Sequence, residues 1–546
     1  MTVRRIIGCP GGGKTHKLEE LAQRAAGTYG ASNVLAVSLT RTAAAEIGGR
    51  DTGIPDENCA TLHAHALRAL EITHDEVAET PAVMRQFNAA HEGLIASANT
   101  DGWAGEDDGA RGQASAVHAA VTNHRARMTP TTEWSNDERA YDVAWQDFCV
   151  QTGRYDFTTM IERCIDEHVD PLSAPRVILA DEAQDFTRLE FGLLMQWAKS
   201  TDATVIVGDT EQCIFWFRGA DPEALEQVPI ARSESLTQSY RVPRAVHAAA
   251  TTWVSQLPGP NVHWQPRDAD GAVDLAPYAL RDAADTADAA IESAREQTTM
   301  VLASCRYMLG PLVAELKARG EPFANPWRET EAAWNPLAGA GTRALLALLA
   351  PRPDAHRRMW TWGDLQALTE PMQASALARG AKASIKAHCM VDELCQTHIN
   401  ETVPLDTLFT LLGTDDPPLL GIDRDLRAAL DWWTAGLSAK GHGAARYPLA
   451  VLDAHGAAGL KETPRLTIGT AHSVKGGEAA HVLVAPEISK EGFYEGWLGG
   501  GAARDAIVRQ FYVACTRARE KLTVLDAGCP EYAPLPDVIR KMNVCV

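Results

Sequence analysis

Long hydrophobic stretches are missing from this chain of 546 residues. The longest uninterrupted apolar run, Ala344–Ala350, has seven residues, whereas a membrane-spanning helix needs about 20. The N-terminal region also lacks the apolar run and small-residue cleavage site of a secretory signal. The sequence therefore predicts a protein without a membrane partner that stays in the cytoplasm. Its alanine-rich composition favours a bacterium or a phage-infected cell.

Paired cysteines and an excess of positive charge are lacking as well. Eleven cysteines are spread from Cys9 to Cys545 without a CxxC pair, so neither a zinc ribbon nor a thiol redox motif is predicted. The 51 Lys and Arg residues against 71 Asp and Glu residues give a net charge of −20. This excludes a protein that is basic over its whole surface. It does not exclude a local basic groove, because net charge averages over domains.

Short apolar segments that alternate with helical patterns dominate the chain. Such alternation is typical of parallel sheets in α/β proteins. The segments form two clusters, one in the first 235 residues and one beyond about residue 295. We expect strands at residues 3–7, 34–39, 177–179, 205–207, 300–303, 466–468, 481–484 and 522–525. Residues 71–150 and 331–449 have mainly helical patterns and are expected to be insertions into the α/β cores.

A glycine-rich motif follows the first expected strand. Residues 8–15 read GCPGGGKT and fit GxxxxGK[ST], between a strand and a helix, which is the context that this motif requires. The glycines let backbone N–H groups surround phosphates, and the helix N-terminus favours anions. Lys14 is expected to reach the β- and γ-phosphates, and Thr15 to bind Mg²⁺. The predicted phosphate site is Gly8, Cys9, Pro10, Gly11, Gly12, Gly13, Lys14 and Thr15.

Two adjacent carboxylates follow another apolar segment. Residues 177–180 precede Asp181 and Glu182, so a buried strand would deliver both to the sheet edge where ligands bind. Asp181 is expected to hold Mg²⁺ through water, and Glu182 to accept a proton from the attacking water. The alternative is an acidic first turn of a helix. The complete phosphate motif elsewhere in the chain favours the catalytic interpretation.

Seven further segments follow one another in a characteristic order. With the two motifs above, they resemble the superfamily 1 helicases of the UvrD/Rep/PcrA type. Each later segment is weak alone, but the ordered set is specific. The segments are SLTRTAAAE (38–46), TLH (61–63), DF (156–157), VGDTEQCIFWFRGA (207–220), LTQSYR (236–241), TAHSVKGGE (470–478) and YVACTRAR (512–519).

The resemblance implies a fold class and a domain organisation. The fold would be α/β, with two RecA-like P-loop NTPase domains whose parallel sheets are flanked by helices, and two mainly helical insertions. ATP would bind in the cleft between the two domains. The implied segments are 1–70 and 151–235 (domain 1A), 71–150 (insertion 1B), 236–330 and 450–546 (domain 2A), and 331–449 (a reduced insertion 2B).

The resemblance also implies roles for residues around ATP. Gln212 would sense the γ-phosphate, and Arg241 and Arg517 would act as arginine fingers. With Lys14 and Glu182 they complete the expected catalytic set. Tyr240 would stack on adenine, and Glu478 would contact the ribose. Taken alone, either arginine would more often form a surface ion pair, and Tyr240 would more often pack in a core or an interface.

A DNA path is implied in the same way. Phe215 and Phe217 would stack on bases, which suits any sequence, although either ring could simply pack in a core. Residues 491–497 lie where relatives carry a strand-separating hairpin, or they form a loop folded onto its own domain. The residues expected to contact phosphates and sugars of single-stranded DNA, fixing register without reading sequence, are Thr40, Arg41, Thr61, His63, Thr470 and His472.

The implied activity is that of an ATP-dependent DNA helicase. ATP hydrolysis between the domains would drive 3′→5′ movement along single-stranded DNA and unwinding at junctions with duplex DNA. The short insertions also fit a translocase that acts with a partner nuclease or defence protein without unwinding. Only seven residues precede Gly8, so the adenine-reading segment of relatives is missing and selectivity for ATP stays open. That feature also fits a nucleotide-gated DNA-sensing subunit with an unknown partner protein.

Overall fold

The computed structural model describes residues 2–39, 47, 52–91, 93–94, 110–258, 263–328, 334–349, 359–389, 398–414 and 425–544. The chain divides into two compact units. Unit 1 comprises residues 1–280, 300–308 and 469–546, and unit 2 comprises residues 281–299 and 309–468. Thr40 and Arg41, two of the expected DNA contacts, lie outside the described residues.

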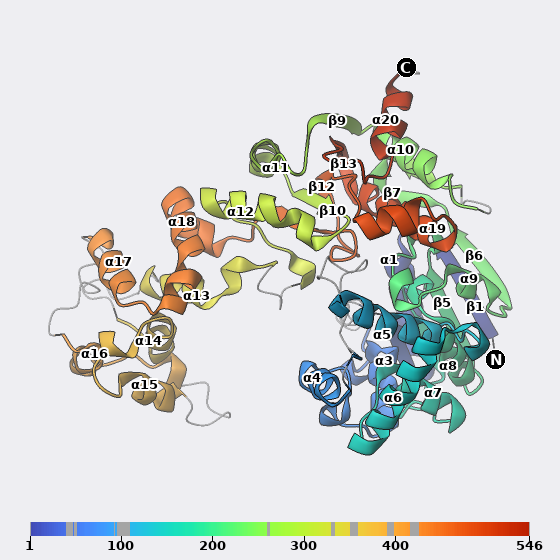
Figure 1. Ribbon diagram of the computed structural model, residues 1–546, viewed down its shortest axis with the longest axis horizontal. Coiled ribbons are helices and arrows are strands. Elements are labelled where there is room, and N and C mark those ends of the chain that lie inside the picture. Colours follow the sequence, from blue (N-terminus) through green and yellow to red (C-terminus); the bar gives the residue numbers. More distant parts are fainter. Residues whose placement is uncertain are drawn as a thin grey trace. The chain divides into compact units, whose positions relative to one another are not determined.

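A parallel sheet lies at the centre of the N-terminal part of unit 1 (Figure 1). Within the described residues it has six strands in the order β3-β2-β4-β5-β1-β6, and its neighbouring strands pair in parallel. All four strands expected in this region are present. Two others were missed, because β3 is short and the polar sequence of β6 lacks a buried-strand pattern. The strands are β1 (Thr2–Gly8), β2 (Val34–Ser38), β3 (Cys59–Thr61), β4 (Val177–Ala180), β5 (Ala203–Gly208) and β6 (Arg232–Leu236).

Helices cover both faces of this sheet. Successive strand residues point to opposite faces, so Ala36 and Leu179 belong to one core and Leu35 and Ile178 to another. The first core packs against α1 (Lys14–Tyr29), and the second against α3 (Leu62–Ala69), α7 (Phe157–Asp166) and α8 (Arg188–Ala198), with α9 (Pro222–Gln227) beside it. The predicted α/β architecture with a parallel sheet between helices is confirmed.

The described part of residues 71–150 is helical, as its pattern predicted. Its helices are α4 (Pro81–Ala90), α5 (Ala110–Ala126) and α6 (Asn136–Thr152). They enclose an aromatic core in which Phe87 contacts Tyr141, Trp145 and Phe148 edge to face. Arg125 of α5 connects this core to α7, because its Nη1 donates to Asp156 Oδ2 over 2.8 Å.

A second sheet uses strands from the C-terminal part of the chain. In the described residues it has five strands in the order β11-β10-β12-β13-β9, and β12 pairs with β13, and β13 with β9, in parallel. The four strands expected in this cluster are present. The strands are β9 (Ala272–Ala279), β10 (Thr299–Ala303), β11 (Leu466–Thr470), β12 (Ala479–Val484) and β13 (Ala518–Asp526).

Further elements of unit 1 accompany this sheet. The strands β7 (Gln238–Pro243) and β8 (Gln265–Arg267) form a small parallel pair. The helices are α10 (Arg244–Val254), α19 (Gly501–Cys515) and α20 (Leu535–Val544), with the π-helix η14 (Gly492–Trp497) before α19. Trp253 of α10 anchors to α19, since its Nε1 donates to the Val508 carbonyl over 2.9 Å.

Unit 2 is mainly helical, as expected for residues 331–449. Its longest described helix, α18, packs closely on α13. The contact leaves no room for a side chain at Gly341, where an added Cβ would collide with the backbone of Ala444. Trp433 is fully buried, and its Nε1 donates to the Leu368 carbonyl over 3.1 Å. The helices are α11 (Ala283–Glu296), α12 (Gly310–Arg319), α13 (Ala340–Leu349), α14 (Trp362–Thr369), α15 (Ala381–Cys389), α16 (Leu405–Leu412), α17 (Leu426–Ala435) and α18 (Ala439–Lys461).

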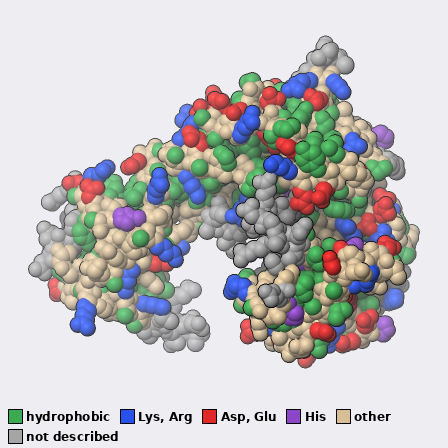
Figure 2. All heavy atoms as spheres, viewed as in Figure 1, with side chains coloured by type: hydrophobic (Ala, Val, Ile, Leu, Met, Phe, Trp, Pro, Cys, Tyr) green, Lys and Arg blue, Asp and Glu red, His purple; other side chains and the backbone are tan. Residues whose placement is uncertain are grey.

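Both signs of charge are mixed on the face of the molecule that Figure 2 shows. On the face shown in Figure 2, the coloured Lys and Arg side chains lie among Asp and Glu side chains instead of forming one large patch. None of the helices in the described ranges has both the length and the apolar character that a membrane span requires.

Candidate functional site

The phosphate-loop segment, Gly8–Thr15, joins β1 to α1 in unit 1. Gly11 and Gly13 have φ angles of 66° and 76°, which favour glycine because it has no Cβ. The loop is fastened to β7, where the Tyr240 N–H donates to the Gly11 carbonyl over 2.9 Å. The Ser239 hydroxyl donates to the Pro10 carbonyl over 2.7 Å. The loop and β7 therefore form one hydrogen-bonded structure.

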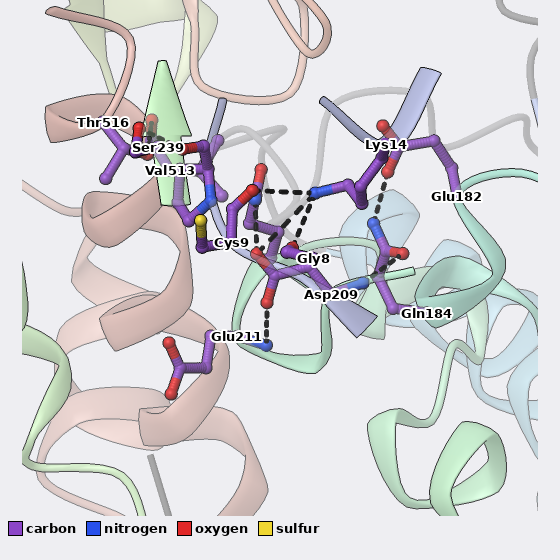
Figure 3. A network of polar contacts seen from close by, with 12 residues as sticks. Gly8, Cys9, Lys14, Glu182, Gln184, Asp209, Glu211, Ser239, Val513 and Thr516 are labelled. Carbon is purple, nitrogen blue, oxygen red and sulfur yellow. Dashed lines mark hydrogen bonds and ion pairs between the residues drawn. The ribbon is translucent and has the colours of Figure 1, made fainter. Parts of the chain in front are cut away.

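Lys14 points back into this loop (Figure 3). Its Nζ donates to the Gly8 carbonyl over 2.9 Å and lies 3.9 Å from Asp209 Oδ2. Asp209 is 2% exposed, and it accepts a hydrogen bond from Gln212 Nε2 over 2.5 Å. Burial raises the pKa of Asp209, with Lys14 opposing this effect. The lysine is thus held at the base of the loop by oxygen atoms from two adjoining elements.

The two expected carboxylates follow β4 directly. Asp181 is 4% exposed, and its Oδ1 accepts the Glu182 N–H over 2.9 Å. Glu182 has a φ of 52°, a conformation that is uncommon for residues other than glycine and concentrates at functional sites. Gln184 connects the two sides of the site, because its Nε2 donates to Glu182 and its Oε1 accepts the Asp209 N–H (Figure 3).

These groups surround a single cavity of about 490 Å³ in unit 1. The structure brings together Lys14, Thr15, Asp181, Glu182, Gln212, Tyr240, Arg241, Glu478 and Arg517 as lining residues, along with Gly11, Gly12 and Gly13. Gly8, Cys9 and Pro10 belong to the adjoining loop. The cavity also includes Phe215, which was expected to stack on bases, and residues for which no role was expected, namely Ser38, Leu39, Asp185, Lys475 and Gly476.

Arg517 lies between α19 and β13 and is buried, with 2% exposure. Its acceptors are neutral: Nη2 donates to Gln212 Oε1 over 3.2 Å, and Nη1 to the Gly477 carbonyl over 3.1 Å. Burial and the positive charge of Arg241 lower the pKa of Arg517 to about 9. A surface ion pair, the alternative considered for this arginine, is therefore wrong.

Arg241 and Tyr240 lie on β7. Arg241 Nε donates to Glu478 Oε2 over 2.7 Å, while Arg519 Nη1 donates to the other oxygen of Glu478 over 2.9 Å. Tyr240 is 70% exposed, and a Cβ added at Gly13 would lie 3.8 Å from its ring. Tyr240 thus presents an open aromatic face beside the loop and does not pack in a core.

Lys475 is one of the cavity residues that sequence reasoning missed. Its Nζ forms an ion pair with Asp185 and lies 3.5 Å from Glu182 Oε2. Burial would raise the pKa of Glu182, but Lys475 and Lys14 outweigh it and lower the pKa to about 2. Burial lowers the pKa of Lys475 to about 8, despite Glu182. The available signal was its position within the segment 470–478, but the sequence did not show that this segment meets Asp185.

The residues expected to contact DNA occupy two places. Thr61 caps α3, because its Oγ1 accepts the Ala64 N–H over 3.2 Å. His63 in the first turn of α3 has its Nδ1 3.5 Å from Glu190 Oε1 and its ring against Phe157. Thr470 is buried, with 3% exposure, at the end of β11.

Phe215, Phe217 and His472 form one aromatic cluster. The His472 ring centroid lies 5.3 Å from that of Phe217 and 5.7 Å from that of Phe215. His472 Nε2 also lies 3.0 Å from the Ile214 carbonyl oxygen. Phe215 is buried in a hydrophobic core, as its alternative interpretation held, whereas Phe217 is half-buried.

Residues 491–497 were open to two interpretations, a strand-separating hairpin or a segment folded onto its own domain. The segment is largely the π-helix η14, and Trp497 stacks on Trp253 with centroids 5.9 Å apart. Of the three aromatic candidates, Tyr494 is well exposed, while Phe493 and Trp497 are half-buried. Packing of this segment onto its own unit is therefore observed.

The strand, glycine-rich loop and helix, with carboxylates at the end of a neighbouring strand, define a P-loop protein. Residues 2–229 match the model of the UvrD/REP helicase N-terminal domain. This part of the chain is therefore similar to the N-terminal domain of UvrD-type superfamily 1 helicases, in agreement with the resemblance that the motifs indicated.

Individual relatives match shorter segments. The chain is 28% identical over 130 residues to DNA helicase II of Escherichia coli K12, and equally to that of Salmonella typhimurium, covering 21% of this chain and 18% of theirs. It is 39% identical over 87 residues to F-box DNA helicase protein 1 of Schizosaccharomyces pombe, covering 16% of this chain and 10% of that protein. The chain thus spans less than a fifth of the length of these relatives.

Proposed function

We propose that this protein is an ATP-dependent DNA helicase that moves 3′→5′ on single-stranded DNA and unwinds duplex DNA at junctions. One observation carries the proposal. A single cavity gathers the phosphate loop, two carboxylates and two arginines that come from separate parts of unit 1. Phosphoryl transfer depends on positioning and charge stabilisation, and these are the groups it needs.

The cavity residues suit Mg²⁺ with ATP as substrate. Thr15 and Asp181 would hold the metal, because Mg²⁺ prefers oxygen ligands and both side chains line the cavity. When bound, the metal would neutralise charge on the phosphates. Lys14 would bind the β- and γ-phosphates. Tyr240 would stack on the adenine through its exposed ring, and Glu478 would contact the ribose.

Hydrolysis would depend on Glu182 and the arginines. Glu182 would accept a proton from the attacking water while the oxygen of that water bonds to the γ-phosphorus. Arg241 and Arg517 would stabilise the charge that develops on the transferred group. The neutral acceptors of Arg517 leave its positive charge uncompensated by direct carboxylate contact in this geometry, and that supports an anion as its natural partner. Gln212 would relay the state of the γ-phosphate to Arg517.

Movement on DNA requires two bodies that change their separation. We propose that the sheet β1–β6 belongs to one RecA-like domain and the sheet β9–β13 to a second, with the segment borders expected from the sequence. Thr61, His63, Phe217, Thr470 and His472 would contact single-stranded DNA, together with Thr40 and Arg41. The names of the relatives, all DNA helicases, support DNA as the partner.

The test is steady-state ATPase activity with and without single-stranded DNA. We expect strong stimulation by DNA in the wild-type protein. Glu182→Gln should lose about 10²–10⁴-fold in kcat, the usual contribution of a general base, while still binding a fluorescent ATP analogue. Glu223→Gln, which changes a 73%-exposed carboxylate on α9, is the matched control and should retain wild-type kcat.

A fork-unwinding assay with both polarities then separates the possible outputs. Strand separation on a substrate with a 3′ single-stranded tail supports the helicase. DNA-stimulated ATPase without strand separation supports instead a translocase that serves a partner nuclease. Absence of stimulation by DNA contradicts the motor and favours a nucleotide-gated sensing subunit.

A further inference from the structure

Lys475 occupies the space beside the Glu182 carboxylate. Its Nζ lies 3.5 Å from Glu182 Oε2 and pairs with Asp185, whose side chain is fully buried. The Lys475 side chain is itself only 10% exposed. Breaking a buried ion pair by removing one partner is costly, so Lys475 fixes both carboxylates in place. Glu182, the proposed base, is therefore restrained in this conformation.

The turn that carries Lys475 begins at residues expected to contact DNA. Thr470 and Ser473 close this turn through reciprocal hydrogen bonds of 2.8 and 3.2 Å between side chain and backbone. The Lys475 N–H donates to the His472 carbonyl over 3.4 Å. His472 and Lys475 are thus parts of one short hydrogen-bonded turn.

The aromatic cluster provides a second connection. The Phe215 ring contacts Phe217 and His472, and Lys475 Nζ lies 5.4 Å from its centroid. Gly476 follows Lys475 with a φ of 86°, a conformation that glycine adopts without strain. The lysine therefore lies next to a glycine in a left-handed conformation and close to a packed aromatic ring.

We propose that Lys475 is a positioning residue that restrains Glu182 in an ion pair until single-stranded DNA engages His472 and Phe217, whereupon the 470–477 turn shifts and releases Glu182. The inference rests on the proposed function, in which Glu182 is the base. Once released, Glu182 takes a proton from water while the water oxygen bonds to the γ-phosphorus. The bond from the γ-phosphorus to the β–γ bridging oxygen breaks, and ADP leaves with that electron pair.

The experiment compares Lys475→Met, which keeps the length of the side chain but removes its charge, with Lys475→Arg, which keeps the charge. The full chain is assayed for kcat and KM with and without a saturating thymidine oligonucleotide. In Lys475→Met we expect the DNA-free kcat to rise at least about fivefold with KM for ATP within about twofold, so that stimulation by DNA shrinks. Lys475→Arg should retain the low DNA-free kcat.

Lys521→Met is the matched control, because it removes a lysine–carboxylate pair of 2.9 Å with Asp274 outside the cavity. It should leave both rates unchanged. Melting temperature and binding of a fluorescent ATP analogue verify that each variant is folded. If Lys475→Met does not fold, Lys475→Gln, which keeps a donor for Asp185, provides the same comparison.

Two failures can be told apart. If wild-type ATPase does not respond to DNA, the proposed function is wrong. If wild type responds but the neutral Lys475 variants lose DNA-free and DNA-stimulated kcat by the same factor, the helicase proposal stands and the restraint is overturned. In that case Lys475 acts on the phosphate or on the structure of the turn.

Discussion

Two buried arginines of unit 1 lie in contrasting surroundings. Arg125 donates to Asp156 over 2.8 Å and to Glu162 over 2.5 Å, and although burial lowers its pKa, these carboxylates raise it overall. Arg517 donates to neutral oxygens, and burial together with Arg241 lowers its pKa to about 9.

Whether a buried arginine is available to a ligand depends on the groups that accept its hydrogen bonds. Arg125 already pairs with carboxylates, and these pairs connect α5, α6 and α7. Its positive charge is therefore compensated within the protein and is not available to a ligand. Arg517 lines a cavity and shares it with other cations, which is an arrangement that an anionic ligand would relieve. Burial alone does not distinguish the two arginines, whereas the identity of their acceptors does.

The largest expected effect concerns Arg517, the arginine without a direct carboxylate partner. Arg517→Ala should lower DNA-stimulated kcat by about 10³-fold, the lower end of what arginine fingers contribute, with little change in the urea midpoint of unfolding. The comparison breaks if unfolding shifts strongly while kcat per folded molecule stays near wild type, because Arg517 would then be structural.

Arg125→Met is the corresponding test for the arginine that is paired with Asp156 and Glu162. It leaves Asp156 and Glu162 without their cation, and removing one partner of a buried pair costs about 3–5 kcal/mol. Urea unfolding followed by tryptophan fluorescence should show this loss. ATPase kcat of the folded variant should stay within about twofold of wild type, and a large fall in kcat would show that the network also serves the cavity.

A smaller effect is expected for the exposed aromatic face beside the phosphate loop. Tyr240→Ala should raise KM for ATP roughly two- to tenfold, the range of one aromatic stacking contact, with kcat little changed. Tyr240→Phe keeps the ring and should behave as wild type. Equal KM values for all three proteins would remove Tyr240 from the nucleotide site.

The smallest effect concerns a carboxylate beside the Arg125 network. Burial, reinforced by Asp156, raises the pKa of Glu79 to about 8, although its Oε1 accepts the Phe157 N–H over 2.7 Å. A folded pKa above the ordinary value of 4.5 means that the folded state holds the proton more tightly. The stability of the wild type therefore declines as pH rises from about 4.5 to 8.

Glu79→Gln removes this titration. Its melting temperature should match that of the wild type at pH 5 and exceed it at pH 8.5 by at least about 2–4 °C, the shift expected per kcal/mol for a large domain. A constant difference between the two proteins at both values would place the effect in packing and not in protonation.

The sequence predicted the central strands of the fold and the phosphate loop well. Strands buried on both faces of a parallel sheet read as continuous apolar runs, so β2 and β4 were visible, and the spacing of Gly8–Thr15 indicated the loop. β6 escaped because an exposed edge strand can be polar. For residues 491–497 the sequence left open a strand-separating hairpin or a segment folded onto its own domain, and only the structure showed the second, because the local sequence does not reveal that Trp497 stacks on Trp253.

Contacts between distant segments were the other limit. The pairing of Lys475 with Asp185 joins the turn after β11 to the loop after β4, and local patterns do not encode such encounters. The φ of 52° at Glu182 is likewise imposed by its surroundings. Roles that the sequence suggested for Gln212 or Glu478 remain predictions, although both residues line the cavity.

The attachment of β7 to the phosphate loop makes the two expected arginine fingers unequal. Hydrogen bonds from Ser239 and Tyr240 connect β7 to Pro10 and Gly11. Arg241, which also lies on β7, would therefore move together with the loop that would bind the nucleotide phosphates. Arg517, between α19 and β13, has no such tether in the described contacts. If the cavity opens and closes during turnover, the Arg241 guanidinium would stay beside the phosphates. The Arg517 guanidinium would approach and leave them in each cycle.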